Sequence, residues 1–142
     1  MIWFKKPSVA ELNNRHPNHI AAFLGIEFTE IGDDFIKAKM PVNAKTHQPV
    51  GILHGGANVV LAETLGSVAS NLILNPDKNM GVGLEVNANH VRPVKDGFVS
   101  GVCTPLHIGG KTHVWDIKIY NDKGKLSCVS RLTVAIVPAV II

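Results

Sequence analysis

Cysteine, charge and long apolar runs are all scarce in this sequence of 142 residues. The two cysteines, Cys103 and Cys128, lack CxxC spacing and lie within strand-like segments, which favours two reduced thiols in a core. No uncharged apolar run reaches the length of a membrane span. The N-terminus, MIWFKKPSVAEL, lacks the apolar region and the small-residue cleavage site of a signal peptide. We therefore expect a cytoplasmic protein that does not enter a membrane.

Charged residues make up 18% of the sequence and give a formal net charge of +3. The Lys and Arg residues are scattered without a run, so neither nucleic acid nor a membrane surface is an expected partner. A phosphorylated small ligand is compatible with this charge. With 46% hydrophobic residues, the chain fits one globular domain spanning residues 1–142.

Sequence motifs of several enzyme classes are also missing. There is no G-x-S-x-G nucleophile elbow, and the glycine-rich turn at 109–111 lacks the spacing of a P-loop. His16 and His19 are close in sequence but straddle Pro17, and no second cluster of metal-ligating residues accompanies them. We expect neither a metal nor a bound cofactor.

The segment from Gly51 to Pro76 carries the longest helical pattern. Apolar residues recur at helical spacing, and further apolar residues make the opposite side hydrophobic as well. A helix that is apolar on nearly all sides is typical of a buried one. We expect it to begin near Gly55 and Gly56 and to end before Pro76.

Strand-like segments precede and follow this helix in the sequence. Consecutive strands with short connections favour an antiparallel sheet and an α+β fold, in which about six strands curl around the helix. The uncovered face of such a sheet and the apolar helix both indicate self-association. The expected strands are Ile26–Ile31, Phe35–Pro41, Val82–Val94, Phe98–Pro105, Thr112–Tyr120 and Leu126–Val137, and short helices are expected at Val9–Arg15 and Ile20–Leu24.

Glu63 is the only carboxylate in the helical segment. A buried carboxylate is costly unless it is paired, so one interpretation is a structural Glu satisfied by a neighbouring Arg or hydroxyl group. The other is a general base or a nucleophile. Ser67 lies one helical turn further on and can hydrogen-bond to whatever Glu63 acts upon.

The expected start of the helix has the sequence His54-Gly55-Gly56. Free N–H groups at a helix start stabilise an oxyanion, although a Gly-Gly pair also occurs for steric reasons alone. Gln48, in the preceding loop, can orient a thioester or a water molecule. Gly55 and Glu63 are about 12 Å apart along a helix, which is too far for a Glu side chain to span. If both serve one site, they come from different subunits related by a two-fold axis.

Two further cationic segments are open to two interpretations. His90 and Arg92 close one strand-like segment, and Lys111 ends the turn that starts at Leu106. These residues are either solvated charges or ligands for phosphate groups.

Taken together, the strings LHGGANVVLAETLGSVAS, THQPVG and VGLEVNANHVRP identify a resemblance that covers residues 1–137. The sequence resembles the hotdog-fold acyl-CoA thioesterases of the 4-hydroxybenzoyl-CoA thioesterase type, which use a catalytic glutamate. Within that group it is most similar to the 1,4-dihydroxy-2-naphthoyl-CoA hydrolases of menaquinone synthesis. The aryl-carrier-protein thioesterases that proofread siderophore synthesis are a sister group.

The resemblance implies a curved antiparallel sheet around the long helix, and dimers that associate into tetramers. It assigns the catalytic carboxylate to Glu63 and the carbonyl-polarising amide to Gly55, with His54 and Gln48 positioning the thioester and Ser67 assisting. Val68 matches the CoA-specific members better than the carrier-protein members. The residues implied to contact CoA are Gly83, His90, Arg92, His107, Gly109, Gly110 and Lys111, of which Gly110 and Lys111 replace the Ser-Arg pair found in many members.

The expected function is hydrolysis of an aromatic acyl-CoA thioester, with a proofreading thioesterase acting on carrier-protein thioesters as the alternative. A dehydratase on the same fold would need an acidic residue near His54, and Val50–Leu53 has none. A non-catalytic acyl-CoA sensor would need a DNA-binding unit, and about 25 residues before the first strand are too few for one. A purely structural oligomer would leave Glu63 unexplained.

Overall fold

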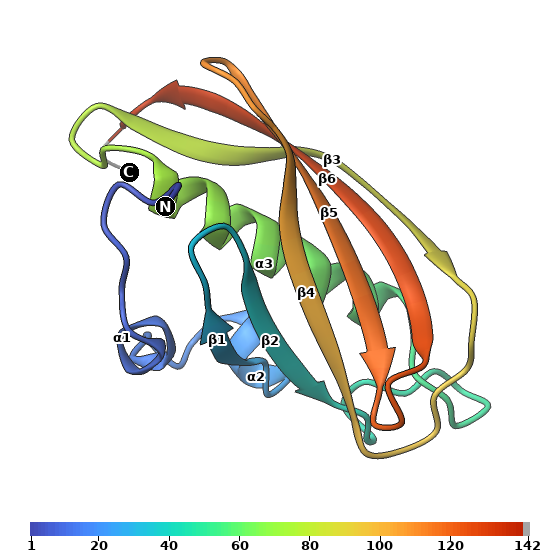
Figure 1. The fold of residues 1–142 in the computed structure, drawn as a ribbon. Coiled ribbons are helices and arrows are strands. Elements are labelled where there is room, and N and C mark those ends of the chain that lie inside the picture. Colours follow the sequence, from blue (N-terminus) through green and yellow to red (C-terminus); the bar gives the residue numbers. More distant parts are fainter. Residues whose placement is uncertain (141–142) are drawn as a thin grey trace.

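In the computed structural model, which describes residues 1–140, a curved six-stranded sheet lies over one long helix (Figure 1). The helix, α3, runs from Gly55 to Ile73. The sheet has the order β1-β2-β4-β5-β6-β3, and all neighbouring strands are antiparallel. The predicted α+β architecture is therefore confirmed. The strands are β1 Glu27–Ile31, β2 Ile36–Pro41, β3 Asn79–His90, β4 Phe98–Ile108, β5 Thr112–Asn121 and β6 Leu126–Pro138.

The core forms where alternating strand residues meet one side of α3. In β5, Trp115, Ile117 and Ile119 are buried while Lys118 is exposed, as the alternation in the sequence predicts. Gly66 of α3 lies directly against Leu132 of β6, because a Cβ at this position would lie 2.5 Å from a Leu132 methyl carbon. This close approach lets the helix pack against the sheet and fixes where its remaining side chains point.

The two N-terminal helices are shorter than predicted. Helix α1 covers Val9–Asn13 and helix α2 covers Ile20–Phe23. A capping box forms at Ser8, with Glu11 donating its backbone N–H to the Ser8 hydroxyl at 3.1 Å.

Three strand ends differ from the prediction by three residues or more, and one of them is the start of β3, which lies at Asn79 instead of Val82. Strand β3 stops at His90 instead of Val94, because the N–H groups of Val91 and Arg92 both turn to the Ser127 carbonyl. Strand β4 continues past Pro105 to Ile108, which pairs with His113 beyond an irregularity after Pro105. The turn between β4 and β5 is correspondingly short, and only residues 109–111 separate the two strands.

The two sides of α3 differ in burial. The side facing the sheet is buried, but the opposite side is only half-buried in the single chain, so this chain alone does not bury the helix all round. The half-buried residues are Val59, Val60, Glu63, Thr64, Ser67 and Val68. In the part of the chain that the structure describes, no helix has both the length and the apolarity needed to cross a membrane.

A polar cluster lies inside the core, on the buried side of α3. The Ser70 hydroxyl accepts a hydrogen bond from Trp115 Nε1 at 2.7 Å and is 3.0 Å from His113 Nδ1. All three side chains are buried. Burial lowers the pKa of His113 from its ordinary value, and nearby His107 lowers it further, so the ring is neutral at pH 7.

We expect Ser70→Ala to lower the free energy of unfolding by about 1–3 kcal/mol, because it leaves buried donors without a partner. Urea unfolding monitored by circular dichroism measures the effect. Ser67→Ala is the matched control on the same helix: the Ser67 hydroxyl is half-buried and bonds to none of the described residues. Equal stability of the two variants would contradict this account of the core.

Candidate active site

The first turn of α3 leaves one backbone donor free. The His54 side chain caps the helix, with Nδ1 accepting a hydrogen bond from the Gly56 N–H at 2.8 Å. The N–H groups of Ala57 and Asn58 bond to the His54 carbonyl. The Gly55 N–H donates to none of the described residues. It is therefore a free amide at the positive end of a 19-residue helix, where an anion or an oxyanion is stabilised.

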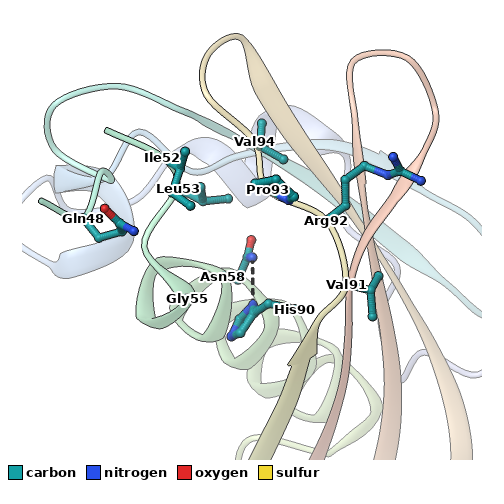
Figure 2. Close-up of a pocket in the computed structure, with 10 residues that line it drawn as sticks. All are labelled: Gln48, Ile52, Leu53, Gly55, Asn58, His90, Val91, Arg92, Pro93 and Val94. Atoms are coloured by element: carbon teal, nitrogen blue, oxygen red, sulfur yellow. Dashed lines mark hydrogen bonds between the residues drawn. The ribbon is translucent and has the colours of Figure 1, made fainter. Parts of the chain in front are cut away.

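A pocket of about 410 Å³ opens beside this amide (Figure 2). It lies between the loop before α3, the first turn of α3 and the segment that follows β3. Four predicted site residues, Gln48, Gly55, His90 and Arg92, come together here from three separate stretches of sequence. The lining residues are Gln48, Ile52, Leu53, Gly55, Asn58, His90, Val91, Arg92, Pro93 and Val94.

The loop before α3 holds Gln48 in a defined position. Its side-chain oxygen accepts a hydrogen bond from the Val50 N–H, and its backbone N–H donates to the Ile52 carbonyl at 2.8 Å. Gly51 closes the turn with a φ of 83°, a conformation that favours glycine. The Gln48 amide NH₂ therefore remains the donor group available to a ligand in the pocket.

His90 lies directly on Gly55. A Cβ at residue 55 would be 2.7 Å from His90 Nε2, so any side chain at this position would force the ring to move. Asn58 Nδ2 lies 3.2 Å from His90 Nδ1 and donates to it, which places the ring proton on Nε2, the side facing Gly55. Asn58 was not predicted from the sequence, although one signal was present: an amide side chain one turn after Gly55 in an otherwise apolar stretch. In the structure this side chain is buried.

Glu63 lies outside this pocket, two helical turns after Gly55. Its carboxylate rests against Gly83 of β3, where any Cβ would overlap Oε1. Among residues 1–140, Glu63 has no ion pair and no side-chain hydrogen bond. The interpretation of Glu63 as a structural carboxylate satisfied by an Arg or a hydroxyl is therefore not supported within the chain. It is a half-buried, unpaired acid on the uncovered side of α3.

Ser67 and Val68 follow on the same side of the helix. They line a second hollow of about 310 Å³ together with residues of helix α2 and of the loop before it. The hydroxyl of Ser67 has no side-chain hydrogen bond to any residue between 1 and 140. The roles assigned to Ser67 and Val68 stay predictions.

The residues implied to contact CoA form two groups in one chain. His90 and Arg92 lie at the C-terminal end of β3, whereas the turn with His107, Gly109, Gly110 and Lys111 lies near its N-terminal end. The pairing shows this, since Ala135 of β6 is opposite Thr112 of β5 on one side and Val82 of β3 on the other. About 23 Å of strand separates Gly83 from His90. One chain therefore does not gather these residues at one site.

Neither cysteine is suited to be a nucleophile. Burial raises the pKa of the Cys103 thiol well above its ordinary value and that of Cys128 to about 11. Both are free and buried, and they remain neutral thiols at pH 7. In the described residues, no group of three His, Cys, Asp or Glu side chains is placed to hold a metal ion.

The cap role of His54 can be separated from a role on the substrate. Asn is a good helix cap, so His54→Asn is expected to keep the melting temperature, while His54→Ala loses about 1 kcal/mol of stability. If the ring also positions the thioester, both variants lose activity to a similar degree. Thermal unfolding and turnover, measured on the same samples, test this. Full activity in His54→Asn would mean that His54 acts only as the helix cap and does not position the substrate.

Comparison with known proteins agrees with this geometry. Residues 50–128 match the family described as the thioesterase superfamily. The chain is 52% identical over 136 residues to 1,4-dihydroxy-2-naphthoyl-CoA hydrolase of Escherichia coli, covering 96% of this chain and 99% of that protein.

Two crystal structures extend the similarity to the whole fold. A thioesterase from Pseudomonas aeruginosa superposes with a TM-score of 0.95 at 48% identity, covering 97% of this chain and 99% of its own. A thioesterase from Haemophilus influenzae gives 0.94 at 44% identity, with 99% and 98% covered. The predicted hotdog fold and thioesterase resemblance are confirmed. The chain belongs to the thioesterase superfamily and is a hydrolase with the hotdog fold.

Proposed function

We propose that this hydrolase cleaves aromatic acyl-CoA thioesters and that 1,4-dihydroxy-2-naphthoyl-CoA is its principal substrate. The observation that carries the proposal is the free Gly55 N–H at the start of α3, which opens into a pocket, together with an unpaired carboxylate on the same helix. The similarity to the Escherichia coli hydrolase supports the choice of acyl group. The buried thiols are consistent with a cytoplasmic location, which is part of the proposal.

In the proposed reaction, the thioester carbonyl accepts a hydrogen bond from the Gly55 N–H. The positive end of α3 then stabilises the tetrahedral oxyanion. Glu63 either takes a proton from the attacking water or attacks the carbonyl itself to give a mixed anhydride, which water then hydrolyses. In both routes the thiolate of CoA leaves and is protonated, and the products are the free acid and CoA. The proposed chemistry uses neither a metal nor a cofactor.

We further propose that the site is shared between two copies of the chain. Strand β3 is an edge of the sheet, and its Val82 and Leu84 side chains are exposed. Antiparallel pairing of two β3 strands about a two-fold axis between Val86 and Asn87 would place Gly83 opposite the partner's His90. Because Glu63 touches Gly83 and His90 lies on Gly55, this pairing brings each carboxylate toward the partner's free amide.

The same pairing brings the β4–β5 turn of one copy toward the partner's His90 and Arg92. The two groups of residues implied to contact CoA would then serve one bound nucleotide, with Arg92 and Lys111 near its phosphates. Association of two dimers into a tetramer would use the outer face of the sheet, which no described helix covers (Figure 1).

A panel of thioesters tests the proposed substrate class. We expect kcat/KM for 1,4-dihydroxy-2-naphthoyl-CoA and benzoyl-CoA to exceed that for palmitoyl-CoA at least about 10-fold, because a confined pocket discriminates by shape. Release of the free thiol is followed with a chromogenic reagent. Faster hydrolysis of an aryl-carrier-protein thioester than of the matching CoA thioester would favour the proofreading function. Tight binding with no turnover would favour an acyl-CoA sensor.

A further inference from the structure

The carbonyl oxygen of the Asn58 side chain is the one buried side-chain polar atom among residues 1–140 that lacks a hydrogen-bond partner. Asn58 itself is only 4% exposed. Buried polar atoms in proteins are nearly always paired, because an unpaired one loses its bonds to water without replacement. An unpaired buried acceptor therefore indicates a partner that the single chain does not supply.

This oxygen faces the pocket beside Gly55. The other end of the amide is fixed, since Nδ2 donates to His90 Nδ1 at 3.2 Å. Figure 2 shows Oδ1 directed away from His90, toward the part of the pocket beneath Pro93. The bond to His90 thus orients the amide so that its acceptor points into the pocket.

Asn58 and the free amide share one face of α3. Residue 58 follows Gly55 by one turn, about 4.5 Å along the helix axis, and residues three apart lie on the same side. The pocket therefore presents a free donor, the Gly55 N–H, and a free acceptor, Asn58 Oδ1, within one helical turn. A ligand that satisfies both needs a carbonyl oxygen with a hydrogen-bond donor nearby.

We propose that Asn58 is a specificity-determining residue whose carbonyl oxygen accepts a hydrogen bond from an N–H or O–H group adjacent to the thioester. The inference rests on the proposed function, because that function places the thioester carbonyl on the Gly55 N–H. Two parts of an aromatic acyl-CoA carry such a donor. One is the amide N–H of the thiol arm, two carbons beyond the sulfur, and the other is a hydroxyl group ortho to the carbonyl on the aromatic ring.

Four small thioesters separate the two donors. Benzoyl and 2-hydroxybenzoyl groups are each attached to N-acetylcysteamine, which has the amide N–H, and to 2-mercaptoethyl acetate, in which oxygen replaces that N–H. Thiol release by the wild-type enzyme and by Asn58→Leu gives kcat and KM for each pair. Leu has the same branched shape as Asn, although a larger volume, and it removes the acceptor. Asn58→Ala, measured in parallel, covers the case in which the larger apolar side chain prevents folding.

In the wild-type enzyme, deleting the donor that Asn58 contacts is expected to lower kcat/KM by about 10- to 100-fold. In Asn58→Leu, removing that same donor from the substrate is expected to leave kcat/KM almost unchanged. Removing the other donor is expected to change kcat/KM by as much as it does in the wild-type enzyme. Asn71→Leu is the matched control, because Asn71 is on the same helix but its amide bonds to Gly81, away from this pocket. It should retain the wild-type ratios between substrates.

Two results would overturn the inference. Wild-type rates and wild-type substrate ratios in Asn58→Leu would mean that Asn58 contacts neither donor. An equal loss on all four thioesters would mean that Asn58 only holds His90 in place. If the wild-type enzyme hydrolyses none of the four thioesters and none of the CoA panel, the proposed function fails, and the inference fails with it.

Discussion

Replacing Glu63 with Gln is expected to lower kcat by about 10²- to 10⁴-fold, the range for loss of a general base or nucleophile, with the fold retained. Gln has nearly the same shape, and Glu63 makes no ion pair or side-chain hydrogen bond within residues 1–140 that the substitution would break. Steady-state thiol release measures kcat, and thermal unfolding checks the fold. Turnover within a few-fold of wild type would remove Glu63 from the mechanism.

Mixing two variants, each expected to be nearly inactive because it removes one group of the proposed site, tests whether Glu63 acts across a subunit boundary. Glu63→Gln and Gln48→Ala are unfolded together, refolded as a mixture and assayed. In a shared site, half of the random dimers are mixed, and each mixed dimer has one site with both wild-type residues. Activity should therefore return to about one quarter of the wild-type value. A site contained within one chain would give no recovery, which would contradict the two-fold proposal.

Gly83→Ala is expected to lower kcat by about 10²-fold, because displacing a reacting group by about 1 Å lowers the rate by this much. An added methyl group would overlap the Glu63 carboxylate, which is the flexible end of its side chain and can move aside. Gly83 does not have a left-handed φ, so Ala fits the backbone there. Alanine in place of a strand glycine should leave stability equal or slightly higher. The melting temperature and kcat are measured together.

A double variant shows whether the methyl group acts through Glu63. In the Glu63→Gln background, adding Gly83→Ala should change the residual rate by much less than 10²-fold, because the carboxylate is already absent. Independent, multiplicative effects would instead indicate that Gly83 acts on the substrate directly or on subunit pairing. Light scattering on each variant checks that the oligomeric state is unchanged.

Local patterns in the sequence were sufficient for the elements of the fold. The glycines at 55 and 56 marked the start of α3, and the alternation of residues along β2 and β5 matches the faces that pack on the core. The strand ends were harder to predict, because they depend on hydrogen bonds to distant strands. Val91 and Val94 favour a strand, yet β3 stops at His90, where the chain turns its N–H groups to Ser127.

Burial of α3 was overpredicted for a similar reason. An apolar pattern predicts that a surface is buried, but it does not tell whether the same chain or a second chain covers that surface. The side of α3 with Val60 and Glu63 is only half-buried in the single chain, although its composition is that of a covered surface. The Asn58 contact was missed because its partner, His90, is 32 residues away. Only the packing of β3 against α3 brings them together.

The position of β3 at the edge of the sheet has a consequence for solubility. Twelve residues of strand, interrupted by one bulge between Gly83 and Glu85, present backbone groups that can pair with any other extended chain. Long exposed edges of this kind promote aggregation unless they are blocked, and here Glu85 is the only charged residue in the strand. A second copy paired along β3 would remove this template. Substitutions that weaken the pairing should therefore increase precipitation at high concentration as well as lower activity.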